Sequence, residues 1–347
     1  MQPLHQVVAG ISESQLCRFA AATLFVVCAP GVSIAQSLTL EDSDVRFSSG
    51  ITAIEIGPQE TECVVGTEDG TVVVYSLRDR FKGMTFSCET GVVSLAVRDD
   101  GAQIAAGTLE PAELWDVSTD EPKRVDRIKV AAGHHAHVGF VGRDELMIVP
   151  SGGGLGINTA IRRDSEGRCK LFRLLRDEYE RWPFFHCVVT AGQSQLMVTG
   201  LWDDRIDVYD ARNGVLVDRL GRQRNAITRS GARSVVFSDD ERFLCSGHNH
   251  GLVRLWSVQD WEPVWEVDLR SNVLDVAFER RARKIVVATI GMVHVIEVES
   301  GKVVAEGKAR RGGKTKYMVV AFSSASGVIA NGVGDERMHL WTYQDEE

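Results

Sequence analysis

Two histidine clusters are the side chains in this sequence best suited to bind a metal ion. They are His134-His135-Ala136-His137 and His248-Asn249-His250, and imidazole nitrogens are good ligands for zinc and copper. Neither cluster has the spacing of a closed set of ligands, and the fold would have to bring the two together. We therefore predict no metal site and no bound cofactor.

Two further patterns resemble catalytic or nucleotide-binding motifs but fail on closer reading. Gly313-Lys314-Thr315 is similar to the end of a phosphate-binding loop, yet the earlier glycine that this loop requires is replaced by Lys308. His186 and Cys187 are neighbours on an expected strand, so their side chains point to opposite faces and cannot act as a base and a nucleophile. We predict no catalytic residues.

The bulk composition is typical of a soluble globular protein: 347 residues, 44% hydrophobic and 25% charged. The net charge of −9 disfavours nucleic acid as the partner, because an acidic surface repels phosphate backbones. The run Lys308–Lys316 is basic, and it either docks an anionic partner or is a solvated loop.

The N-terminus has the pattern of a secretory signal. Phe19–Ala29 is uncharged and mostly apolar, Arg18 precedes it, and Ser33-Ile34-Ala35 supplies small residues for a signal peptidase. The apolar run is too short to span a bilayer, which needs about 20 residues. We predict a signal peptide over residues 1–35 and a mature, exported protein, periplasmic or extracellular, without a membrane span. An uncleaved N-terminal anchor is the alternative.

Cysteine usage does not indicate a disulfide framework. Five cysteines remain beyond residue 35, and an odd number leaves at least one thiol free. Cys63 and Cys245 lie in apolar runs that are typical of buried strands.

Seven units of about 40 residues repeat along residues 36–347, each with an alternating strand, a short apolar strand, a turn and a strand that usually carries an aromatic. Aligning the third strands matches Tyr75, Trp115, Phe172, Tyr209, Trp256, Ile296 and Trp341. The second interval, from Trp115 to Phe172, is long, which suggests an insertion in the third unit over Ser151–Arg168. Continuous apolar runs such as Val72-Val73-Val74 indicate strands covered on both faces. The pattern predicts an all-β, seven-bladed β-propeller of four-stranded antiparallel blades.

The last unit ends at its third strand, Met338–Thr342, so its outer strand is missing. Ser37–Leu40 or Val45–Phe47 could supply it. Because an unpaired edge would leave the ring open, we predict that the N-terminal strand closes the seventh blade and that closure depends on residues 37–48.

The units resemble those of the WD-repeat family of β-propellers over about residues 37 to 345. The fifth unit is most similar, with Phe237-Ser238-Asp239-Asp240, Ser246-Gly247 and Leu255-Trp256-Ser257. The family's Gly-His dipeptide occurs once, as Gly133-His134, and no unit has the full set of His, Ser or Thr, Asp and Trp. Lactonase-like and quinoprotein-like propellers stay open as alternatives.

The WD-repeat topology implies a partner-binding surface, which we call the top face: the turns between second and third strands together with the loops that enter each blade. Loops on a rigid scaffold often carry function. The residues expected there are Glu68, Asp69, Glu110, Trp202, Asp203, Asp204, His248, His250, Asp335 and Arg337. Trp202 is the strongest candidate, because an aromatic at a turn tip is well placed for a partner, although it could equally fold over its neighbouring blade.

Repeats without a catalytic signature predict a non-catalytic, exported protein–protein interaction scaffold with a protein partner. The alternative is an envelope enzyme or small-ligand binder that uses the mouth of the central channel. That alternative requires several carboxylates or histidines to converge near the axis.

Overall fold

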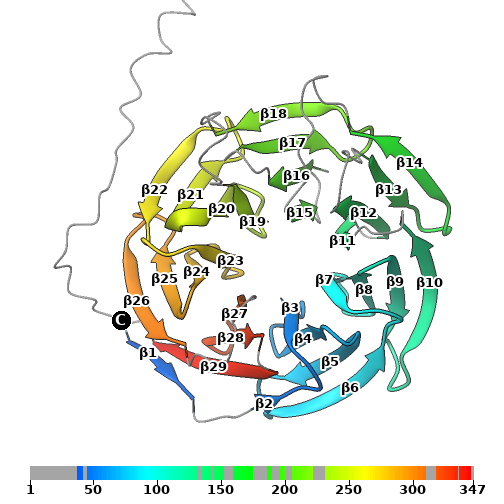
Figure 1. The fold of residues 1–347 in the computed structure, drawn as a ribbon, viewed down its shortest axis with the longest axis horizontal. Helices are drawn as coiled ribbons and strands as arrows, with labels where there is room; N and C mark the ends of the chain where they lie inside the picture. The colour runs from blue at the N-terminus through cyan, green and yellow to red at the C-terminus, as the bar shows by residue number, and fades with distance from the viewer. Residues whose placement is uncertain are drawn as a thin grey trace, which may run out of the picture.

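The computed structural model describes residues 37–41, 45–130, 135–142, 144–151, 159–174, 186–189, 196–200, 205–221, 231–309, 318–334 and 336–344. These residues form seven antiparallel sheets arranged in a ring (Figure 1). Six of the sheets have four strands, and the seventh has five because two short N-terminal strands share its outer position. The predicted all-β, seven-bladed propeller is confirmed.

Blades are numbered here in chain order, and strands within a blade run from the axis to the rim. Blade one contains β3 (Ile51–Ile56), β4 (Glu62–Thr67), β5 (Thr71–Ser76) and β6 (Phe81–Ser87). Blade two contains β7 (Val92–Val97), β8 (Gln103–Thr108), β9 (Pro111–Asp116) and β10 (Lys123–Lys129). Blade three contains β11 (His135–Val141), β12 (Glu145–Ser151), β13 (Thr159–Arg163) and β14 (Cys169–Arg173).

The remaining blades follow the same order. Blade four contains β15 (His186–Val189), β16 (Leu196–Gly200), β17 (Ile206–Asp210) and β18 (Leu216–Leu220). Blade five contains β19 (Ala232–Phe237), β20 (Phe243–His248), the short 3-10 helix η2 (Asn249–Gly251), β21 (Leu252–Ser257) and β22 (Pro263–Asp268). Blade six contains β23 (Val273–Phe278), β24 (Lys284–Thr289), β25 (Met292–Glu297) and β26 (Val303–Lys308). Blade seven contains β27 (Met318–Ser323), β28 (Val328–Val333), β29 (Arg337–Gln344), β1 (Ser37–Leu40) and β2 (Val45–Arg46).

The hydrophobic core lies between the blades, because each sheet covers the face of its neighbour. Every side chain of β24 is buried, as its continuous apolar run predicts. The aromatic of a third strand packs on the outer strand of the preceding blade: Trp115 of blade two lies against Phe86 of blade one, with ring centroids 4.5 Å apart. Trp256 of blade five likewise packs in one cluster with Leu220 of blade four. A blade is therefore buried only when both neighbours are present.

Blade three departs from the sequence-based alignment. The prediction that Phe172 lies on a third strand is wrong, because it lies on the outer strand β14. The third strand is β13, which falls inside the stretch Ser151–Arg168 that the sequence suggests to be an insertion. Once β13 is recognised, the interval that follows Trp115 no longer stands out from the others.

Arg163 explains why the alignment failed. It pairs with the second residue of β12, Leu146, just as Trp115 pairs with the second residue of β8. An arginine thus occupies the position that is aromatic in most blades. Its Nε donates to Asp126 Oδ2 of blade two at 2.7 Å, so an ion pair joins these two blades where other blades use an aromatic contact.

Polar side chains on the inner strands link the blades around the axis. Ser94 of blade two donates to the carbonyl of Ala136 in blade three at 3.1 Å. Asp275 of blade six accepts from Ser234 Oγ of blade five at 2.7 Å and from the Val320 amide of blade seven at 3.0 Å. Burial raises the pKa of Asp275 to about 6, against the opposing effect of these hydrogen bonds.

The ring closes as predicted, through N-terminal strands on blade seven. β1 and β2 both pair antiparallel with β29, with Leu40 opposite Trp341 and Val45 opposite Met338. The sequence offers these segments as alternatives, whereas the structure uses both. β29 is the last strand of the chain, so the two ends of the described chain form one sheet.

Removing the apolar side chains of β1 should weaken the whole domain. Leu38 and Leu40 pack against the cluster that contains Trp341 and Ile329. We expect Leu38→Ser with Leu40→Ser to lower the free energy of unfolding by about 2–3 kcal/mol, because both side chains are half-buried. Urea unfolding measures this, and Thr39→Ala, at the exposed position between them, is the matched control. An unchanged midpoint in the double variant would contradict the role of β1 in closure.

Candidate functional site

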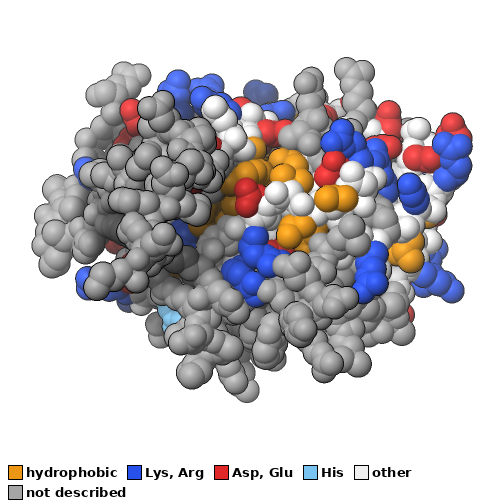
Figure 2. All heavy atoms as spheres, turned by 90° about the horizontal axis from the view of Figure 1, so that it is seen from above, with side chains coloured by type: hydrophobic (Ala, Val, Ile, Leu, Met, Phe, Trp, Pro, Cys, Tyr) orange, Lys and Arg blue, Asp and Glu red, His pale blue; other side chains and the backbone are white. Residues whose placement is uncertain are grey.

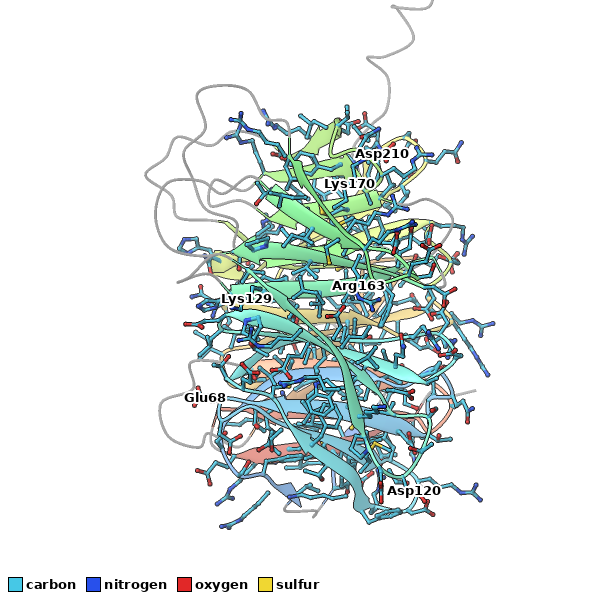
Figure 3. The ribbon with its side chains drawn as sticks, turned by 90° about the vertical axis from the view of Figure 1, so that its right-hand side faces the viewer. Glu68, Asp120, Lys129, Arg163, Lys170 and Asp210 are labelled. Atoms are coloured by element: carbon cyan, nitrogen blue, oxygen red, sulfur yellow. The ribbon has the colours of Figure 1, made fainter. Side chains whose placement is uncertain are left out.

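Backbone hydrogen bonds place the second-to-third-strand turns beside the loops that enter each blade. The amide of Glu68 donates to Gly50 O at 2.9 Å, and that of Leu109 donates to Gly91 O at 3.1 Å. Figure 3 shows Glu68 at one face of the disc and Asp120, from a turn between a third and an outer strand, at the other. In blades one and two, the turns between second and third strands therefore lie beside the entering loops on one face of the disc.

Glu68 and Asp69 share one turn but have different environments. Asp69 Oδ1 accepts from Thr67 Oγ1 at 2.6 Å and from the Thr71 amide at 3.1 Å. Burial opposes ionisation, but these hydrogen bonds outweigh it and hold the pKa of Asp69 below its usual range. The Glu68 side chain is exposed and bonds to no other residue within the described ranges. Asp69 shapes the turn, and Glu68 is available to a partner.

His248 is buried, so the expectation that it contributes to the exposed top face is wrong. Its Nε2 lies 2.9 Å from Ser246 Oγ, which accepts a hydrogen bond from Trp256 Nε1 at 3.0 Å. This chain of three polar side chains fixes the interior of blade five. His250 is exposed at the tip of the same turn, in the left-handed region with φ of 72°.

The other predicted top-face residues divide into two groups. Glu110 is exposed at the tip of its turn, and Arg337 begins β29 opposite Arg46 of β2. Four predicted residues lie outside the described residues: Trp202, Asp203, Asp204 and Asp335. Most of the glycine-rich segment (152–158) and of the basic segment (310–317) also lies outside them.

Two exposed apolar residues also lie at turns between second and third strands, and neither is among the residues expected from the sequence. Leu109 is 44% exposed beside Glu110, and Ile290 is 43% exposed at the equivalent turn of blade six. Leucine and isoleucine are unusual at the tip of a tight turn, where Gly, Asn and Asp predominate. The apolar residue in the turn Thr108-Leu109-Glu110 is therefore the sequence feature that could have indicated an exposed contact residue.

A network of charged groups fixes the loop beside Leu109. Glu113 is fully buried, and its carboxylate accepts from the Glu89 amide at 2.8 Å and from Arg124 Nη1 at 3.3 Å. Arg127 pairs with Glu89 at 2.7 Å and holds the pKa of Glu89 below its usual range. The backbone under the exposed leucine is therefore held by buried and paired charges.

Carboxylates also converge near the axis of the ring. Glu55 lies on the inner strand β3, and its pKa is raised to about 8. The first cause is desolvation by the surrounding protein, which disfavours the charged carboxylate, although part of the side chain is exposed. The negative charges of Asp239 in blade five and Asp275 in blade six add to the effect.

The structure gives no support to a metal centre in the part of the chain that it describes. Among those residues, no three His, Cys, Asp or Glu side chains are grouped closely enough to bind an ion. His135 and His137 lie on β11 of blade three, whereas His248 and His250 lie in blade five, and His134 is outside the described residues. Cys63, Cys88, Cys169 and Cys245 are free thiols.

Comparison with known proteins agrees with this geometry. Residues 225–257, which cover β19 to β21 of blade five, match the model of the WD domain, G-beta repeat. The seven-bladed ring and this match to one blade together support a WD-repeat β-propeller. It is the blade with the Trp256–Ser246–His248 chain that matches.

Relatives share only part of their length with this chain. Dynein axonemal assembly factor 10 of Xenopus tropicalis is 23% identical over 159 residues, which are 43% of this chain and 44% of that protein. The same factor of Danio rerio is 25% identical over 116 residues, 31% of this chain and 32% of that protein. A probable di- and tripeptidase of Saccharomyces cerevisiae is 34% identical over 98 residues, 26% of this chain but 11% of that protein. The chain thus spans less than half the length of these relatives.

No helix among the described residues is both long and apolar enough to cross a membrane.

The crowded carboxylate of Glu55 predicts a pH-dependent stability. Because the folded pKa is raised, native Glu55 favours the protonated form, and this contribution is lost as the pH rises from about 4.5 through about 8. Glu55→Gln removes the ionisation, so its stability gain over the wild type should be near zero at pH 4.5. At pH 9 the gain should reach roughly 1 kcal/mol, a discounted value because water screens the charge.

Thermal unfolding from pH 4.5 to 9 measures the difference between the two proteins. Glu62→Gln, at an exposed position on the neighbouring strand β4, is the matched control. If the stability difference between Glu55→Gln and the wild type stayed constant across the whole pH range, the raised pKa of Glu55 would be contradicted.

Proposed function

We propose that this protein is a non-catalytic scaffold that binds a protein partner through the top face of the propeller. The observation that carries the proposal is the pair of exposed apolar tips, Leu109 and Ile290, on turns that the ring holds in place. Apolar side chains in otherwise polar turns are typical of interface centres, and carboxylates such as Glu68 and Glu110 suit the polar rim around them.

The ring lowers the cost of binding on this face. The turns are fixed by backbone hydrogen bonds and by buried charges such as Glu113. Little conformational entropy is then lost when a partner docks. Free carboxylates at Glu68 and Glu110, in a chain with a net charge of −9, favour a partner surface that presents an apolar side chain beside lysine or arginine.

The relatives are consistent with a scaffold. Two of them are named as assembly factors, a name that describes bringing other proteins together. The yeast peptidase matches over a small fraction of its length, so its name is a poor guide to the function of this chain.

We also propose that the protein is exported after cleavage of residues 1–35. The signal pattern over Phe19–Ala35 supports this, and residues 1–36 lie outside the described residues. β1 begins at Ser37, so cleavage after Ala35 would leave the closing strand intact with one residue before it.

A small-ligand role for the axis is the second candidate, and Glu55 favours it. Glu55 and Asp275 lie on the inner strands β3 and β23, and after desolvation the charges of Asp239 and Asp275 add to the raised pKa of Glu55. Carboxylates of three blades gathered near the axis support this role. A cationic small molecule is the ligand class that such a group would select.

Charge placed at the apolar tips should abolish partner binding through the top face. We expect Leu109→Arg with Ile290→Arg to lose at least 90% of the partner captured from native extract by residues 36–347, because a buried arginine would lack a counter-ion. A photo-crosslinker at position 109 should label that same partner.

The matched control is Val264→Arg, a similarly exposed apolar residue on the rim of blade five. It should capture the partner normally, and a crosslinker at position 264 should not label it. Equal capture by all three proteins would overturn the top-face proposal, and binding of cationic metabolites that Glu55→Gln abolishes would favour the axial role.

Export predicts the N-terminus of the mature protein. N-terminal sequencing of protein from the native host should begin at Gln36, since the peptidase would cut after Ala35. Ala35→Arg should block the cut and leave the longer form, whereas Ser37→Arg, beyond the cleavage site, should be processed. A protein that keeps residues 1–35 would point to the uncleaved anchor instead.

A further inference from the structure

The outer strand of blade three exposes an unusual amount of apolar surface. Cys169, Leu171 and Arg173 share one face of β14, because side chains alternate along a strand, and all three are exposed. Leu171 is 65% exposed, the highest value among the large hydrophobic side chains of the described residues. The adjacent rim of blade four mixes hydrophobic side chains such as Val217 with charges of both signs (Figure 2).

Strand register shows that blade three differs from blades four, five and six at one position. Leu171 on β14 lies opposite Ile161 on β13, two residues before the aromatic position. In blades four, five and six the corresponding pairs are bonded polar groups, at 2.7, 2.5 and 2.9 Å: Asp207–Arg219, Arg254–Glu266 and His294–Glu306. Those pairs satisfy each other at the rim, whereas the pair in blade three offers an apolar surface to whatever lies beside it.

Among the described residues, the charge on β14 beside Leu171 is positive and has no balancing carboxylate. Lys170 and Arg173 form no ion pair with any residue in the described ranges, and both are exposed. Figure 3 shows Lys170 on the flank of the disc that faces the viewer. The nearby arginines differ, because each already has a carboxylate partner: Arg162 with Glu145, Arg163 with Asp126 and Arg168 with Asp164. Arg173 therefore lies on the same face as Leu171, and Lys170 projects from the opposite face of the strand, so both faces of this edge carry a cation without an ion-pair partner among the described residues.

The backbone edge of β14 is also open. Within the described residues, blade three ends in the order β11-β12-β13-β14, so nothing pairs with the outer side of β14. Blade seven shows what such an edge accepts: its β29 pairs with β1 and β2, which come from the opposite end of the chain. An open edge presents a row of amide and carbonyl groups that can template a further strand.

We propose that β14 is the docking edge for an extended, acidic segment of a partner protein, which adds to blade three as a fifth strand. Main-chain hydrogen bonds supply affinity, and alternating side chains supply specificity. On one face of the added strand an apolar side chain covers Leu171 and a carboxylate two residues along meets Arg173, and on the other face a carboxylate meets Lys170. The cations also disfavour pairing of β14 with a second copy of itself. The edge lies on the rim, so this interaction is independent of the top face.

The probe is the peptide fluorescein-Glu-Glu-Val-Glu-Glu-Thr-Val-amide, which carries valine and glutamate on one face and glutamate on the other, with a second peptide in which lysine replaces glutamate. Fluorescence anisotropy on residues 36–347 should show saturable binding of the acidic peptide and at least tenfold weaker binding of the basic one. Lys170→Glu with Arg173→Glu should reverse this preference, and Leu171→Ser should weaken the acidic peptide about fivefold. Lys302→Glu, at an exposed turn of blade six, should change neither.

Backbone pairing has its own control. N-methylation of one alternate set of peptide amides should abolish binding, and N-methylation of the other set should be tolerated, because only one set faces β14. The proposal is overturned if the acidic peptide does not bind, if charge reversal leaves the preference unchanged, or if both methylated peptides bind equally. Stronger binding to phosphatidylglycerol vesicles, lost on the same charge reversal, would assign the edge to a membrane surface instead.

Discussion

Burial of each blade between two neighbours is the constraint on which the rest of this structure depends. A single sheet of this kind is apolar on both faces, so no blade can be stable alone, and the first and last blades must meet. Three kinds of contact join the blades: aromatic packing as between Trp115 and Phe86, the Arg163–Asp126 ion pair, and the hydrogen bonds of Asp275. Pairing of β1 and β2 with β29 makes the set of contacts circular.

Because contacts between blades hold the ring together, the residues of its turns can vary in sequence. On the top face, some turn residues stabilise the fold and others are exposed to solvent. Asp69 and His248 are used internally, one to shape a turn and the other to fix the inside of a blade. Glu68, Leu109 and Ile290 make no such contribution, and they are exposed on a rigid backbone. Residues of the second kind can change with the partner at little cost in stability.

Because the blades repeat one structure, equivalent positions in different blades can be compared, and a residue that departs from the pattern is easy to identify. The rim position occupied by Leu171 and Ile161 is a bonded polar pair in blades four, five and six. Blade three replaces both the aromatic and the polar pair, with Arg163 at one position and an apolar pair at the other. The blade whose repeat is hardest to recognise in the sequence is therefore the one with the most distinctive rim.

The sequence by itself determined the number of blades, their strand content and the closure of the ring, because these follow from local patterns: continuous apolar runs, turn residues and a missing last strand. It could not place Arg163 at an aromatic position, since an ion pair to Asp126 leaves no apolar pattern. It also could not tell buried His248 from exposed Leu109, because turn tips and strand ends differ by one residue along the chain. Those distinctions depend on which groups the neighbouring blades bring alongside, and only the tertiary structure decides that.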